Sequence, residues 1–100
     1  MQTKNKGPYF VYMVRCKHGT YYSGYTVDLE ARISLHNSGK GAKYLRGRAP
    51  VELVFERKYR DLSDALKAER ELKNLKRHEK EALAGEYAKK QIQKAQARAT

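Results

Sequence analysis

The hydrophobic and polar positions of the chain first follow the pattern of strands. Residues 9–16 (YFVYMVRC) are rich in aromatic and β-branched side chains and stay apolar on both faces as far as Val14, which is typical of a central strand covered on two sides. After a turn at residues 17–19, residues 20–25 (TYYSGY) predict the returning strand of a hairpin. Residues 51–59 alternate apolar with charged side chains, which predicts a half-buried third strand.

Helical spacing begins directly after the hairpin. Thr26 is expected to be the N-cap of a helix that runs to about Asn37. Asp28 would lie in the first turn of this helix, where a negative charge is favoured. Leu29 and Ile33 would form its buried stripe.

A second helix is expected to begin after Asp61 or Ser63 and to run to about Leu83, with Gly85 at its end. The order strand–strand–helix–strand–helix predicts an α+β fold, a three-stranded antiparallel sheet flanked by helices. The remaining residues have helix-forming composition but almost no apolar face, so we expect them to be frayed or disordered. The expected units are a flexible N-terminal segment (1–8), one domain (9–84) and a basic tail (85–100).

The charge of the chain indicates its class of partner. The 100 residues carry 22 Lys and Arg against 11 Asp and Glu, a formal charge of +11, and such a balance favours nucleic acid over other partners. An acidic membrane surface is the rival, but the longest apolar stretch, Tyr9 to Val14, is far too short to span a bilayer. The single cysteine, Cys16, is consistent with a reducing compartment. We therefore expect a cytoplasmic protein that binds nucleic acid and not membrane.

A glycine-rich segment offers one candidate phosphate site. Residues 38–50 (SGKGAKYLRGRAP) contain three glycines, four basic residues and no acid, and backbone N–H groups and cations of this kind bind phosphates. The segment is not a Walker loop, because its glycine spacing differs and a strand follows it instead of a helix. The candidate cations are Lys40, Lys43, Arg46 and Arg48.

Four side chains on the hairpin and the first helix have both a structural and a chemical interpretation. Arg32 and His36 are four residues apart beside the apolar stripe, where an arginine stem on the core and a histidine at a helix end need no further role. Tyr12 and Tyr22 lie near the middle of the paired strands. Packing explains most strand tyrosines, and a tyrosine acts as a base only where cations or a metal stabilise its phenolate.

Glu69 is less easily explained by packing alone. It falls on the apolar stripe of the second expected helix, four residues after Ala65, and a partly buried carboxylate is costly unless a cation compensates it. A salt bridge to Arg32 or Lys73 and a bound metal ion remain equally open.

Taken together, these residues resemble the GIY-YIG nuclease family, in its small single-domain bacterial subgroup. Both motif tyrosines, the helix arginine and the glutamate of the family pattern are present. Phe10 stands in place of the first motif's glycine, and Ser23 in place of the second motif's isoleucine. The segments that carry the resemblance are residues 10–12 (FVY), 22–24 (YSG), 24–37, 37–44 (NSGKGAKY) and 65–73.

The resemblance implies a metal-dependent phosphodiesterase. One Mg²⁺ or Mn²⁺ would be held by Glu69 with water and a phosphate oxygen. Tyr12 would act as general base for the attacking water, and Arg32 would stabilise charge in the transition state. Tyr22 would position the phosphate or the water, and His36 would assist proton transfer or bind phosphate. The residues implied to hold the strand are Lys73 and, in the glycine-rich segment, Lys40, Lys43, Tyr44, Arg46 and Arg48.

The expected activity is therefore endonucleolytic cleavage of DNA, branched or single-stranded, in repair or recombination. The first alternative is a DNA- or RNA-binding module that does not cut, and the second is a scaffold that recruits a larger repair complex through its polar tail. The presence of Glu69 favours the enzyme, because a lone carboxylate beside phosphates repels the ligand unless a cation intervenes.

Overall fold

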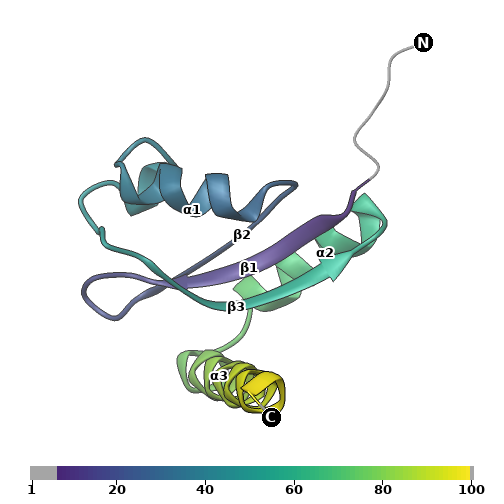
Figure 1. The fold of residues 1–100 in the computed structure, drawn as a ribbon. Coiled ribbons are helices and arrows are strands. Elements are labelled where there is room, and N and C mark those ends of the chain that lie inside the picture. Colours follow the sequence, from purple (N-terminus) through teal and green to yellow (C-terminus); the bar gives the residue numbers. More distant parts are fainter. Residues whose placement is uncertain (1–6, 100) are drawn as a thin grey trace.

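The computed structural model describes residues 7–99. Two antiparallel strands lead into a short helix, a third strand follows, and two helices complete the chain (Figure 1). The elements are β1 (Tyr9–Arg15), β2 (Tyr21–Thr26), α1 (Leu29–Asn37), the 3₁₀ turn η1 (Lys43–Leu45), β3 (Glu52–Tyr59), α2 (Leu62–Lys73) and α3 (Arg77–Ala99).

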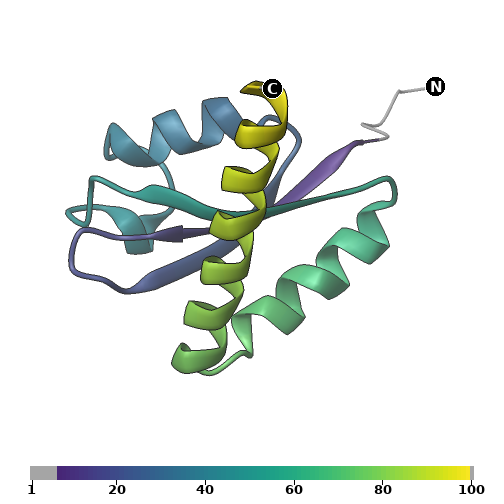
Figure 2. The same cartoon turned by 60° about the horizontal axis from the view of Figure 1, so that its bottom comes forward.

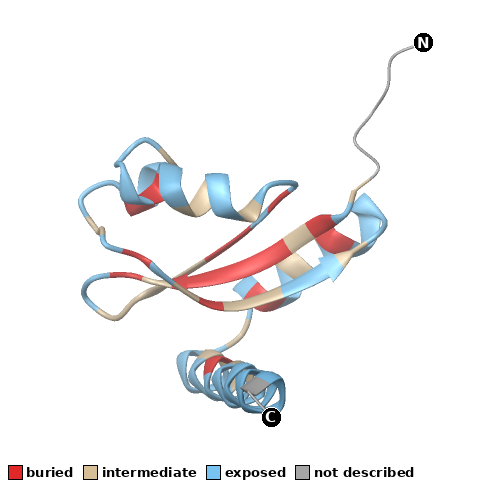
Figure 3. Ribbon diagram, viewed as in Figure 1, coloured by how far each residue is buried: buried red, intermediate tan, exposed pale blue. Residues whose placement is uncertain are grey.

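The sheet has the strand order β2-β1-β3, with both pairs antiparallel. The predicted α+β fold is confirmed. The prediction that β1 is covered on two faces is also confirmed, because its side chains alternate between two apolar clusters. Tyr9, Val11 and Met13 pack with α2 and α3, whereas Tyr12 and Val14 pack on the face that carries α1. Figure 3 shows buried positions concentrated along β1, while α3 is mostly exposed.

The N-cap of α1 is Asp28, whose Oδ1 accepts a hydrogen bond from the Ala31 backbone N–H at 3.1 Å. The prediction that Thr26 caps this helix is wrong. Thr26 is still the last residue of β2, where it pairs with Phe10 of β1. Its hydroxyl oxygen instead accepts from the Asp28 N–H at 3.2 Å, which supports the turn between strand and helix.

The single second helix predicted from the sequence is two helices in the structure. The chain leaves the helix after Lys73, the last residue of α2, and α3 begins at Arg77. Just before α3, the Lys76 backbone N–H donates a hydrogen bond to the Glu79 carboxylate at 2.7 Å, which is a local capping interaction. The break turns the chain, so that α3 runs across the strands (Figure 2).

The predictions of a helix end at Gly85 and of a frayed tail are also wrong, because α3 continues to Ala99. A glycine inside a helix costs only about 1 kcal/mol, and the alanine, lysine and glutamine residues around it favour the helix. Residues 1–6 of the expected flexible segment lie outside the described residues, as does Thr100. Within the described residues, no helix combines the length and the apolar character needed to cross a membrane.

The two N-caps of α1 and α2 provide a matched test of this local structure. Asp28→Ala should lower the free energy of unfolding by about 1 kcal/mol, because it removes an N-cap acceptor. Asp61 is the N-cap of α2 but makes no cap hydrogen bond with its side chain in the described structure, so Asp61→Ala should cost less. Urea unfolding of both variants measures the difference, and equal losses would contradict the assignment of the α1 cap.

Candidate active site

A hollow of about 430 Å³ opens beside the edge strand β2. Residues from four elements line it: Tyr12 from β1, Tyr22 from β2, Arg32 from α1 and Glu69 from α2. These four side chains were selected from the sequence as candidate catalytic residues, and the structure brings them to the wall of one hollow. The sheet supplies the two tyrosines, and the helices on its opposite faces supply the two charged groups.

Gly24 makes room for the hydroxyl of Tyr12. The two residues are direct partners across β1 and β2, and a Cβ added at Gly24 would come within 2.8 Å of the Tyr12 oxygen. Any side chain at this position would therefore displace the hydroxyl from the wall of the hollow. Gly24 belongs to the second motif of the family resemblance, but the sequence alone does not reveal its contact with Tyr12.

Behind the hollow, Tyr12 and His36 form a buried hydrogen bond of 2.8 Å between the tyrosine oxygen and Nε2 of the imidazole. Both side chains are about 1% exposed. Nδ1, on the other side of the ring, accepts a hydrogen bond from the Ala42 backbone N–H at 3.2 Å. A neutral imidazole carries one proton, and a backbone N–H can only donate. Nδ1 is therefore unprotonated, and Nε2–H donates to Tyr12.

Burial and the neighbouring charges together keep the Tyr12 hydroxyl and the His36 imidazole neutral. Burial is the largest influence that raises the pKa of Tyr12, and Tyr22 raises this pKa further; Arg32 opposes the shift and Glu69 adds to it. The pKa of His36 is lowered, first by burial and then by the positive charge of Arg32. A phenolate at Tyr12 therefore needs more positive charge nearby than Arg32 supplies.

Glu69 is the carboxylate of the hollow. Its side chain is 17% exposed, and it forms an ion pair with Lys73 at 3.3 Å. The sequence predicted that a salt bridge to Arg32 or Lys73, or a metal ion, compensates the charge of Glu69, and the structure contains the salt bridge to Lys73. Among residues 7–99, no group of three or more histidine, cysteine, aspartate or glutamate side chains is arranged to hold a metal ion. A single carboxylate beside a substrate phosphate still fits Mg²⁺, which keeps most of its water ligands.

The glycine-rich segment reaches the site through its backbone and through one aromatic ring. Gly41 packs against His36 so closely that an added Cβ would overlap the imidazole, and this contact delivers the Ala42 N–H to Nδ1. The ring of Tyr44 stacks on Tyr22, with 5.9 Å between centroids and 17° between planes. The glycine-rich composition predicts phosphate binding but not the contact of Gly41 with His36, because this contact depends on how the chain turns directly after α1.

The remaining candidate side chains do not line the hollow. Arg48 lies over the ring of Tyr44, 4.3 Å from its centroid. Lys40, Lys43 and Arg46 are exposed on the surface of the segment.

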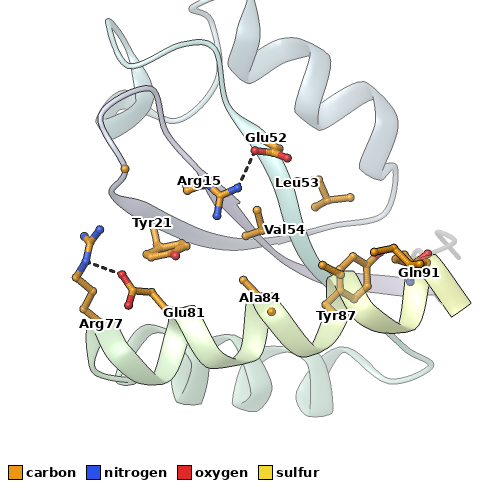
Figure 4. A pocket seen from close by; sticks show the side chains of 14 residues that line it. Arg15, Tyr21, Glu52, Leu53, Val54, Arg77, Glu81, Ala84, Tyr87 and Gln91 are labelled. Atoms are coloured by element: carbon orange, nitrogen blue, oxygen red, sulfur yellow. Dashed lines mark hydrogen bonds and ion pairs between the residues drawn. The ribbon is translucent and has the colours of Figure 1, made fainter.

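A larger hollow, of about 650 Å³, lies elsewhere, between α3 and the strands (Figure 4). Its arginines are already paired, Arg15 with Glu52 at 2.9 Å and Arg77 with Glu81 at 3.1 Å. Paired charges of this kind attract phosphate weakly. The candidate active site is therefore the hollow beside β2.

Comparison with known proteins gives relatives of the same size. A UPF0213 protein of Streptococcus pneumoniae is 44% identical over 77 residues, which cover 77% of this chain and 78% of that protein. The UPF0213 protein YazA of Bacillus subtilis is 46% identical over 81 residues, 81% of this chain and 79% of that protein.

Solved structures are similar as well. The solution structure of the UPF0213 protein BH0048 from Bacillus halodurans has a TM-score of 0.51 at 45% identity and covers 77% of this chain and 82% of that one. The protein EF2693 from E. faecalis has a TM-score of 0.56 at 38% identity, covering 86% and 92%. The model of the GIY-YIG catalytic domain matches residues 8–82. The chain therefore belongs to the GIY-YIG family, whose members are nucleases that act on nucleic acids.

Proposed function

We propose that this protein is a metal-dependent endonuclease that hydrolyses phosphodiester bonds in DNA, in repair or recombination. The observation that carries the proposal is the convergence of Tyr12, Arg32 and Glu69 on one hollow. A base, a fixed cation and a carboxylate around one space are the groups that phosphodiester hydrolysis requires. The excess of positive charge supports a polyanionic substrate.

Glu69 and Arg32 have separate electrostatic roles in the proposed reaction. Glu69 would hold one Mg²⁺ or Mn²⁺, which would supply positive charge to the phosphate and to Tyr12. Arg32 stabilises the negative charge that develops on the phosphate oxygens in the transition state. Lys73, whose side chain is 53% exposed beside Glu69, then pairs with the backbone of the bound strand.

Tyr12 is the general base for the attacking water, and Tyr22 positions the water or the phosphate. His36 helps Tyr12 as a donor: the hydrogen bond from Nε2–H stabilises the phenolate form of the tyrosine. Because Nε2 already carries a proton, His36 does not accept one from Tyr12. The resemblance implied that His36 assists proton transfer or binds phosphate. We assign it instead to positioning Tyr12 and stabilising the phenolate form of that tyrosine.

A specific observation also favours the second candidate, a binding module that does not cut. The ion pair with Lys73 already compensates the partly buried Glu69, so this carboxylate has an explanation without a metal. Binding would be salt-sensitive in either case, whereas cleavage would separate the two functions.

The decisive experiment is Glu69→Gln, which keeps the size of the side chain and removes its charge. We expect metal-dependent cleavage of end-labelled single-stranded, duplex and four-way-junction DNA to fall by at least about 100-fold, a loss typical of a key electrostatic group. Nucleic-acid binding should be largely unchanged.

The matched control is Glu71→Gln, an exposed carboxylate on the same helix, which should cleave like the wild type. EDTA should stop the wild-type reaction. Tight, salt-sensitive binding by the wild type without cleavage of any substrate would support the binding module instead.

The role assigned to His36 predicts a pH dependence of stability. In the unfolded chain the imidazole has its ordinary pKa of about 6.5, whereas in the folded chain this pKa is lowered. As the pH falls through 6.5, the unfolded state takes up more protons, so the free energy of unfolding should decrease. His36→Gln should lose this part of the pH dependence in urea unfolding between about pH 7 and pH 5.

The tautomer itself can be measured by ¹⁵N NMR of the imidazole. At neutral pH we expect a protonated Nε2 and an unprotonated Nδ1 in the wild type. A protonated Nδ1 would contradict the assignment and return His36 to the position of a proton acceptor.

The basic half of α3 predicts a separate contribution to affinity. Removing residues 89–100 deletes Lys89, Lys90, Lys94 and Arg98 and no acidic residue. Affinity for DNA should fall and its dependence on salt should become shallower, because fewer phosphates are neutralised. The cleavage rate at saturating DNA should stay unchanged. Loss of that rate would show that this part of α3 belongs to the catalytic unit.

A further inference from the structure

Tyr44 is a large aromatic side chain that remains 45% exposed. Its place is fixed by the chain around it. The next residue, Leu45, is 1% exposed in the core below, and the backbone oxygen of Tyr44 accepts a hydrogen bond from Arg48 Nε at 2.8 Å. The carbonyl of Arg48 in turn accepts from the Lys17 N–H at 3.0 Å. The ring is thus presented to solvent on an anchored segment.

This exposed ring is connected to the candidate active site by stacked and tilted rings. Tyr44 stacks on Tyr22, which lines the hollow. Tyr22 contacts His36 edge-on, at 5.7 Å between centroids, and His36 holds Tyr12 through the hydrogen bond at 2.8 Å. The exposed ring of Tyr44 is therefore connected to Tyr12 through two intervening rings, those of Tyr22 and His36.

The surroundings of Tyr44 are cationic. Arg48 lies over the ring, and Lys40, Lys43 and Arg46 are exposed on the same segment, which contains no acidic residue. An aromatic ring among exposed cations is the usual arrangement for binding a single strand, in which bases stack and phosphates pair with the cations. A base in an intact duplex is already stacked between its neighbours and would not reach such a ring.

We propose that Tyr44 is the stacking platform for an unpaired nucleobase next to the scissile phosphate, so that the substrate has single-stranded nucleotides at the cleavage site. The inference rests on the proposed function and names its substrate class. The base replaces the guanidinium of Arg48 on the ring, because base–aromatic stacking is stronger than an exposed cation–π contact. Arg48 then gives up its hydrogen bond to the Tyr44 carbonyl and pairs with a flanking phosphate, while the buried Leu45 and the hydrogen bond from the Lys17 N–H still hold the segment.

The test compares two ligands of equal charge, fluorescently labelled oligo(dT)₁₆ and an abasic 16-mer with the same sugar-phosphate backbone. Binding of the full chain is measured by fluorescence anisotropy in EDTA, so cleavage plays no part. The wild type should bind oligo(dT)₁₆ more tightly than the abasic strand. Tyr44→Ala should weaken oligo(dT)₁₆ binding about tenfold and leave abasic binding unchanged, whereas Tyr44→Phe should retain both affinities.

The matched control is Lys43→Ala, the neighbouring exposed cation, which should weaken both ligands by the same factor. Thermal unfolding of the variants checks that a change in affinity is not a loss of fold. Equal affinity of the wild type for the two ligands, or an equal loss of both in Tyr44→Ala, would overturn the platform and leave nucleic-acid binding intact. Absence of binding to either ligand would also overturn the platform, whereas the proposed function would fail only if duplex and four-way-junction DNA were not bound either.

Discussion

The hydrogen bond between Tyr12 and His36 is the interaction on which the rest of the site depends. It joins the central strand to α1 inside the core, with both partners about 1% exposed. Gly24 leaves space at the hydroxyl and Gly41 leaves space at the imidazole. A buried polar group without its partner costs about 1–3 kcal/mol, so this pair constrains both the fold around it and the residues that can stand beside it.

The same burial that fixes Tyr12 also makes it a poor base on its own. Desolvation raises the pKa of the hydroxyl and outweighs the positive charge of Arg32. The donor hydrogen bond from His36 acts in the opposite direction, and so would a cation held at Glu69. The proposed site is therefore inactive until positive charge is added, which links the proposed metal requirement to an observed property of the tyrosine.

The sequence predicted the parts of the structure that local pattern determines. The apolar run of β1 and the alternation of β3 are properties of neighbouring residues, and both elements form as expected. The cap at Asp28 was missed because the pairing of Thr26 with Phe10 is a contact between strands. Gly85 was misjudged because one unfavourable residue does not end a helix whose neighbours favour it. The contact between Gly41 and His36 was not predicted, although the two residues are only five apart, because composition does not show how the chain turns after α1.

The glycine-rich segment contacts the candidate site in two ways, whereas the sequence predicted only phosphate binding for it. Its backbone sets the tautomer of His36 through Ala42, while its ring at Tyr44 packs on Tyr22 of the hollow. A strand that binds to this segment therefore acts on elements that also position Tyr12. The exposed Lys40 and Lys43 make none of these contacts, so in the proposed function they would contribute only charge. In the proposed function, Gly41 would therefore act on the chemistry through His36, and the cations of the segment would act on the affinity.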